Sequence, residues 1–107
     1  MLKPKKLGKK NILSSLDLSE DEILHILELS THIKKKELKI DLDNKVLGLV
    51  FDKSSTRTRV SFQVAMSRLG GMTIDLNPNT SQIGRGEPIK DTARVLDRYC
   101  DVLAIRT

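Results

Sequence analysis

The sequence has 107 residues, of which 38% are hydrophobic and 31% charged, a composition typical of a globular protein rather than a disordered one. No apolar run approaches the roughly 20 residues of a membrane-spanning helix, so we expect no membrane partner. The net charge is +5, but five lysines in the first ten positions account for it. Since a nucleic-acid-binding face needs clustered positive charge on the folded body, we expect no nucleic-acid partner either.

The first third of the chain predicts a basic arm and one helix. We interpret residues 1–14 as a solvated arm that frays, and residues 15–107 as the domain. Ser19 and Glu22 have the spacing of a capping box, and apolar residues then recur at helical intervals. We expect this helix to end in the lysines at 34–36, where cations suit the negative end of the helix dipole.

The rest of the chain alternates strands with helices. Residues 46–51 are apolar on both faces, as in a buried parallel strand. The predicted order is a strand at 46–51, a helix from Thr56 to the Gly70-Gly71 pair, a strand at 72–76, a helix from Pro88 to about Tyr99 and a strand at 102–105. With the first helix, this order predicts an α/β fold of three strands and three helices. Right-handed crossovers would join the parallel strands and place helices on both faces of the sheet.

Hydroxyl and guanidinium groups are concentrated immediately after the first predicted strand, from Ser55 to Arg59. The start of a helix presents unpaired N–H groups and the positive end of its dipole, and the planar fork of arginine matches a phosphate. Ligands of parallel sheets bind at the carboxyl ends of the strands. The sequence therefore predicts a phosphate site built from the backbone of Thr56 and the side chains of Ser55, Arg57, Thr58 and Arg106.

An ordinary structural role is the alternative for these residues. Ser55 would then be a simple N-cap, and Arg57 and Arg59 would be solvated helix residues. The density of the cluster after a buried strand favours a binding site. Asp52 and Glu87 are candidates for orienting the arginines, with ordinary loop charge as the alternative.

The sequence gives less support to a metal site, a nucleotide site or a reactive cysteine. His25 and His32 lie in the first predicted helix with no cysteine or supporting ligand pattern near them, so no metal site is predicted. Neither a Walker loop nor a dinucleotide-binding glycine motif occurs. Cys100, the single cysteine, lies between a helix and a strand, which favours packing over nucleophilic chemistry. Because it cannot form an internal disulfide, it also predicts a reducing, cytoplasmic location.

Two segments resemble a known family. Residues 51–62, FDKSSTRTRVSF, resemble the signature of the aspartate and ornithine carbamoyltransferases. Residues 84–96, GRGEPIKDTARVL, together with IRT at 105–107, are similar to the ornithine branch of that family. The resemblance runs from about Leu13 to Thr107. It implies transfer of a carbamoyl group from carbamoyl phosphate to the side-chain amine of L-ornithine, giving L-citrulline and phosphate in arginine metabolism.

The same resemblance implies roles for individual residues. Ser55, Thr56, Arg57 and Thr58 would grip the phosphate, with Arg57 and Arg106 acting in catalysis. Arg106 would polarise the carbamoyl carbonyl and stabilise the oxyanion of the tetrahedral intermediate. Gln82 matches a loop position that reaches the site of a neighbouring subunit. The family reaction needs no metal and no organic cofactor, and the full-length assembly would be a homotrimer or a multiple of trimers.

The chain also departs from the family pattern. Gln63 stands where many relatives have Glu, and the family's His-Pro-x-Gln, Ser-Met-Gly and Cys-Leu-Pro segments do not occur in it. We therefore expect the N-terminal domain of a longer two-domain enzyme, inactive by itself because the ornithine-binding domain is missing. Two alternatives stay open. The acceptor could be aspartate or putrescine, or the isolated chain could be a non-catalytic phosphate-binding module.

Overall fold

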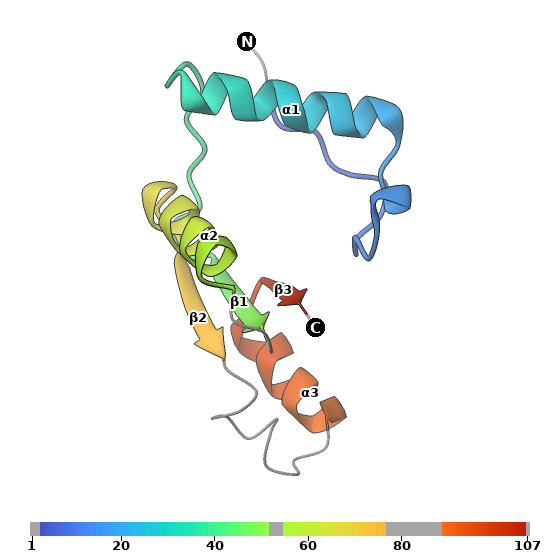
Figure 1. Ribbon diagram of the computed structural model, residues 1–107, viewed down its shortest axis with the longest axis vertical. Helices are drawn as coiled ribbons and strands as arrows, with labels where there is room; N and C mark the ends of the chain where they lie inside the picture. Colours follow the sequence, from blue (N-terminus) through green and yellow to red (C-terminus); the bar gives the residue numbers. More distant parts are fainter. Residues whose placement is uncertain (1–2, 52–54, 77–88, 107) are drawn as a thin grey trace. The chain divides into compact units, whose positions relative to one another are not determined.

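The computed structural model describes residues 3–51, 55–76 and 89–106 (Figure 1). Their contacts divide the chain into two compact units, Met1–Ile40 and Asp41–Thr107. The first unit holds the 3-10 turn η1 (Ser15–Asp17) and the helix α1 (Glu20–Lys34). The second holds β1 (Val46–Phe51), α2 (Thr56–Arg68), β2 (Met72–Leu76), α3 (Ile89–Tyr99) and β3 (Val102–Arg106).

Helix α1 begins where the capping residues predict. The hydroxyl of Ser19 accepts from the N–H of Glu22 at 3.1 Å, and the carboxylate of Glu22 accepts from the N–H of Ser19 at 2.8 Å. This reciprocal pair satisfies two N–H groups that the helix itself leaves unbonded. The helix ends at Lys34, within the lysine run. The predicted start and end of the first helix are therefore confirmed.

Hydrogen bonds join the basic arm to α1 within the first unit. The N–H of Lys5 donates to Nε2 of His25 at 3.1 Å, and the N–H of Gly8 donates to Glu22 at 2.8 Å. Side chains of α1 thus accept bonds from the backbone of the arm, and the contacts group the arm with α1 in the first unit. The predicted division into an arm at 1–14 and a domain at 15–107 stays a prediction.

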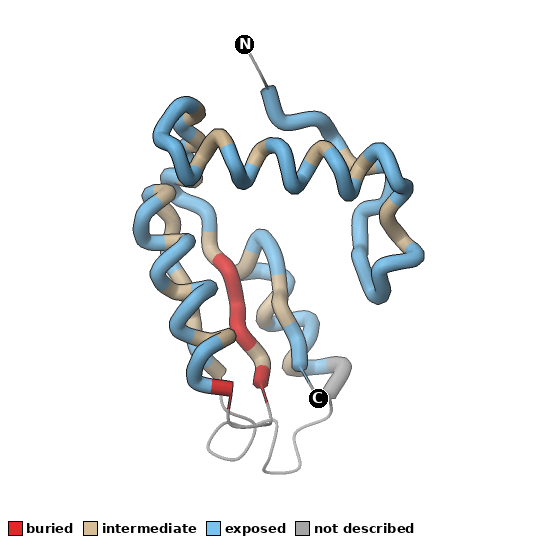
Figure 2. The backbone as a smooth tube through the Cα atoms, turned by 45° about the horizontal axis from the view of Figure 1, so that its top comes forward, coloured by how far each residue is buried: buried red, intermediate tan, exposed pale blue. Residues whose placement is uncertain are grey.

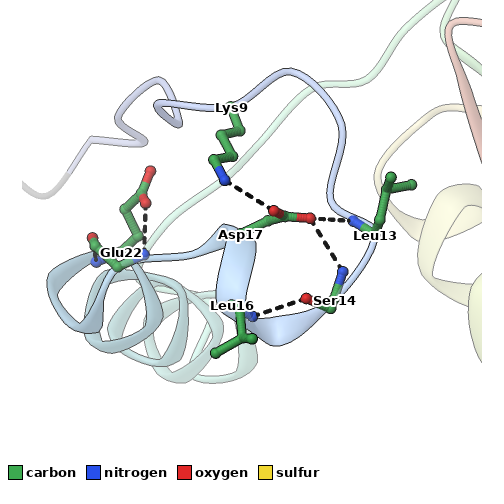
Figure 3. Close-up of polar contacts among 7 residues, drawn as sticks. Lys9, Leu13, Ser14, Leu16, Asp17 and Glu22 are labelled. Atoms are coloured by element: carbon green, nitrogen blue, oxygen red, sulfur yellow. Dashed lines mark hydrogen bonds and ion pairs between the residues drawn. The ribbon is translucent and has the colours of Figure 1, made fainter.

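Asp17 organises the end of the arm (Figure 3). One carboxylate oxygen accepts from the ammonium group of Lys9 at 3.0 Å, and the other accepts from the N–H groups of Leu13 at 2.7 Å and Ser14 at 3.2 Å. The bond from Leu13 is the largest cause that lowers the pKa of Asp17, followed by Lys9. The N–H groups of Ser19 and Gly8 likewise lower the pKa of Glu22.

The second unit is a three-stranded parallel sheet in the order β2-β1-β3, with β1 in the centre (Figure 1). The α/β fold and all three predicted strands are confirmed. Gly70 ends the α2 region with a φ of +88°, a conformation that favours glycine over residues with a Cβ. None of the helices in the described ranges is both long and apolar enough to cross a lipid bilayer.

The two faces of β1 are covered by different elements. Leu47, Leu49 and Phe51 form the core, with 7%, 0% and 3% of their surface exposed, and the buried stretch follows β1 in Figure 2. Their face is the one that α2 covers, since the ring of Phe51 lies 6.3 Å from that of Phe62. On the other face, a Cβ at Gly48 would lie only 3.0 Å from Sγ of Cys100, just beyond α3. The residue that follows α3 therefore lies against the other face, which is the side where a right-handed crossover from β2 to β3 places α3.

Acid should break the hydrogen bonds that hold the arm, but only at a pH below the range in which ordinary carboxyl groups titrate. The pKa values of Asp17 and Glu22 are lowered in the fold, from 3.8 and 4.5 respectively, so their contribution to stability is complete above those values. It is lost as the pH falls through the lower, folded pKa values. We expect the amide NMR signals of Leu13 and Gly8 to change below these ordinary values.

Matched variants distinguish the effect of protonating Asp17 from that of protonating Glu22. Asp17→Asn should abolish the acid-dependent change at Leu13 while leaving that at Gly8. Glu20→Gln, which alters another acid in the first turn of α1, should leave both unchanged. A Leu13 signal that titrates at or above pH 3.8 would contradict the account.

Candidate functional site

The site begins where β1 gives way to α2. Ser55 occupies the N-cap position of α2 and is buried, with 6% of its surface exposed. Its carbonyl accepts the first helical bond, from the N–H of Arg59 at 2.8 Å. The N–H groups of Thr56, Arg57 and Thr58 precede that bond and find no acceptor within the helix. Three donors and the positive end of the helix dipole therefore meet at this point.

The Ser55 side chain does not cap the helix that it precedes. Its hydroxyl makes no capping hydrogen bond, and its oxygen is buried without a hydrogen-bond partner in the described ranges. A buried hydroxyl left in this condition costs about 1–3 kcal/mol. The simple N-cap alternative does not fit this geometry, because a capping serine would bond to an N–H group of the first turn. This hydroxyl and the N–H groups that lack an acceptor within the helix are instead suited to bind an anion together.

Arg57 and Thr58 border a surface hollow next to this turn. The hollow has a volume of about 420 Å³ and is lined by Arg57, Thr58, Ser61, Phe62 and Ala65. Arg57 is exposed and Thr58 is half-buried. A guanidinium group that is exposed beside free N–H groups can form two parallel bonds to a phosphate without first breaking a buried ion pair.

Arg106 reaches the same edge of the sheet from β3. It is the last residue of that strand and lies opposite Phe51, the last residue of β1, in the parallel register. Neighbouring residues in register project to the same side of a sheet, so Arg106 lies on the face that α2 covers. The topology thus brings Ser55, Arg57, Thr58 and Arg106 to one edge, as the sequence predicted. Their part in binding stays a prediction.

Arg59 has a partner that the sequence did not reveal. Its Nε lies 3.1 Å from Oδ1 and 3.0 Å from Oδ2 of Asp75 in β2. Its guanidinium carbon lies 5.8 Å from the centre of the Phe51 ring. Arg59 therefore turns toward the sheet instead of being a freely solvated helix residue. The available signal was Asp75 itself, a single charge in the otherwise uncharged strand MTIDL.

The remaining candidates divide into those the structure describes and those it does not. Asp52, Gln82 and Glu87 lie outside the described residues, so their predicted roles stay predictions. Burial, followed by the neighbouring Asp101, raises the pKa of the Cys100 thiol, which disfavours the reactive thiolate. Within the described ranges, no group of three or more His, Cys, Asp or Glu side chains is placed to hold a metal ion.

Comparisons with known proteins converge on one family. The family described as "Aspartate/ornithine carbamoyltransferase, carbamoyl-P binding domain" matches residues 10–107. The ornithine carbamoyltransferase of Prochlorococcus marinus subsp. pastoris is 76% identical over the whole chain, which spans 35% of that relative. The enzyme of that name from Parasynechococcus marenigrum is 61% identical over 94% of the chain, which spans 32% of it. The chain thus spans about a third of the length of these curated relatives.

Solved structures agree. Ornithine carbamoyltransferase from Gloeobacter violaceus is 53% identical, with a TM-score of 0.76 over 89% of this chain and 30% of that one. Aspartate transcarbamoylase from Trypanosoma cruzi, in complex with carbamoyl phosphate and aspartate, is 34% identical. Its TM-score is 0.81, over 94% of this chain and 34% of that one.

Substitution of Ser55 tests whether its hydroxyl binds an anion or caps the helix. Because the Ser55 hydroxyl bonds to nothing in the described ranges, Ser55→Ala should leave the free energy of unfolding unchanged or raise it. It should weaken the binding of inorganic phosphate, measured by calorimetry, by about 1.5–3 kcal/mol, the value of a hydrogen bond to a charged group.

Ser19→Ala is the matched control, because the Ser19 hydroxyl does cap its helix. It should lower the free energy of unfolding by about 1 kcal/mol and leave phosphate binding unchanged. A loss of stability in Ser55→Ala as large as that in Ser19→Ala, with phosphate binding intact, would show an ordinary N-cap.

Proposed function

This chain belongs to the aspartate/ornithine carbamoyltransferase family, and we propose that it supplies the carbamoyl-phosphate site of an ornithine carbamoyltransferase. The proposed reaction transfers a carbamoyl group from carbamoyl phosphate to the side-chain amine of L-ornithine, yielding L-citrulline and phosphate. The observation that carries the proposal is the buried Ser55 hydroxyl, without a partner in the described ranges, beside N–H groups that have no acceptor within α2. A phosphate group would satisfy both.

The phosphate end of the substrate would bind at the first turn of α2. The N–H groups of Thr56, Arg57 and Thr58 and the hydroxyl of Ser55 would donate to its oxygens, and the Arg57 guanidinium would add a charged fork. Negative charge on the phosphate grows as its bond to the carbamoyl carbon breaks. These donors therefore bind the departing phosphate more strongly than the intact substrate, which lowers the barrier.

The carbamoyl end would lie near the carboxyl end of β3. There the Arg106 guanidinium would donate to the carbonyl oxygen and stabilise the oxyanion that forms when the amine nitrogen attacks the carbon. The leaving phosphate oxygen would then take the electron pair of the broken bond, and the departing phosphate would accept the proton that the amine nitrogen loses. In this proposal positioning and charge carry the catalysis, and neither a metal nor an organic cofactor takes part.

Ornithine is proposed as the acceptor because relatives named ornithine carbamoyltransferase are 76% and 73% identical over the whole chain. Aspartate is the acceptor to weigh against it, because the aspartate transcarbamoylase of Trypanosoma cruzi is 34% identical. Putrescine is a third choice from the sequence. We infer that the residues which select the acceptor amine lie in those regions of the relatives that this chain does not cover.

Two further proposals concern the whole enzyme. The 107-residue chain alone should not make citrulline, because orientation of the amine against the carbonyl carbon is worth about 7–11 kcal/mol of barrier. The full-length enzyme should be a cytoplasmic homotrimer, or a multiple of trimers, in which Gln82 reaches a neighbour's site. These follow from the family and from the single thiol at Cys100.

Replacing Arg57 tests the proposed function in the full-length enzyme. Arg57→Ala should weaken calorimetric binding of carbamoyl phosphate by about 1.5–3 kcal/mol for each charged hydrogen bond removed, and citrulline formation should fall at least in proportion. Arg68→Ala removes another arginine from the far end of α2 and should change neither quantity.

The acceptor is tested alongside. Wild-type enzyme should form product faster with ornithine than with aspartate or putrescine at equal concentrations. Product from aspartate or putrescine alone would overturn the choice of ornithine. Unchanged binding of carbamoyl phosphate by Arg57→Ala would overturn the proposed phosphate site.

A further inference from the structure

Arg57 and Arg59, both in the first turns of α2, project from different sides of the helix. Arg57 and Arg59 are two positions apart, so they project about 200° from one another around the helix axis. Arg57 is exposed and borders the surface hollow, whereas Arg59 turns to the sheet. The contacts that hold the Arg59 side chain therefore also set the direction in which the Arg57 side chain projects from the helix.

Two groups from the sheet hold Arg59. The Asp75 carboxylate of β2 lies 3.0–3.1 Å from Nε of Arg59, and the Phe51 ring at the end of β1 lies 5.8 Å from its guanidinium carbon. The side chains of Arg59 and Asp75 are 22% and 37% exposed, so water screens the pair less than it would a surface pair. One side chain thus links the start of α2 to both β1 and β2.

We propose that Arg59 is a positioning residue for the phosphate site, acting through its contacts with Asp75 and Phe51. These contacts hold the first turn of α2 at one rotation and height above the sheet, so that Ser55 and Arg57 converge on one anion. The carboxylate also balances the charge of Arg59, which keeps this guanidinium at the sheet instead of moving to the anion beside Arg57. The inference rests on the proposed function, since it concerns the same site.

The size of the effect follows from how sharply rate depends on geometry. A displacement of about 1 Å in a binding group can lower the rate by about 100-fold. We therefore expect Arg59→Met and Asp75→Asn, in the full-length enzyme, each to lower kcat/KM for carbamoyl phosphate by about 10- to 100-fold. Each should also weaken the binding of inorganic phosphate, while the KM for ornithine changes little. Arg59→Lys should recover only part of the loss, because an ammonium group lacks the planar fork.

A double-mutant cycle tests whether the two residues act together. The double variant should be no worse than the worse single variant, because either substitution already breaks the same link. Arg68→Met, in the last turn of the same helix, is the matched control and should behave like wild type. If the Arg59→Met variant does not fold, the Asp75→Asn variant is the deciding test, because it keeps the shape of a side chain that is 37% exposed.

Each outcome has a distinct meaning. Wild-type enzyme that binds neither phosphate nor carbamoyl phosphate would overturn the proposed function, and this inference with it. Phosphate binding and kcat/KM unchanged in Asp75→Asn and Arg59→Met, with wild type active, would overturn the inference alone. So would effects of the two substitutions that simply multiply, or a fall in the free energy of unfolding with no change in phosphate binding.

Discussion

The burial of β1 on both faces is the constraint on which the second unit depends. Leu49 is fully buried, and β1 is paired with β2 on one edge and β3 on the other. A central parallel strand of this kind needs cover on both faces, which the crossing helices provide. Because α2 must start beside the end of β1 to cover the Phe51 face, the free donors of its first turn come to the carboxyl edge of the sheet. The proposed site is thus a consequence of how the core is covered.

At the carboxyl edge of the sheet, a buried hydroxyl group without a partner in the described residues lies close in sequence to an arginine with two partners. The Ser55 hydroxyl is buried without a partner in the described part of the chain, an unfavourable arrangement for folding that a bound anion would relieve. Arg59, four residues later, has both an acidic and an aromatic partner. Groups that meet a ligand are generally held by neighbours that do not touch it. The pairing of a free Ser55 with a fixed Arg59 fits this division between binding and support.

Most of the fold could be predicted because its signals are local. The apolar run that became β1, the Ser19 capping box and the glycines after α2 each lie within a few residues. The position of Ser55, Arg57 and Arg106 at one edge followed from the parallel topology. The bonds from the arm to α1 and the partner of Arg59 could not be predicted, since they join residues 14 to 20 positions apart whose pairing has no periodic pattern. Gln82 lies outside the described residues, so its role stays a prediction.

The start of α2 is proposed to bind the phosphate of carbamoyl phosphate. A crystal structure of the full-length protein soaked with carbamoyl phosphate would show whether it does. We expect phosphate oxygens within hydrogen-bonding distance of the Ser55 hydroxyl and of the N–H groups of Thr56, Arg57 and Thr58. Carbamoyl phosphate bound elsewhere, with the Ser55 hydroxyl bonded to another protein group, would contradict it.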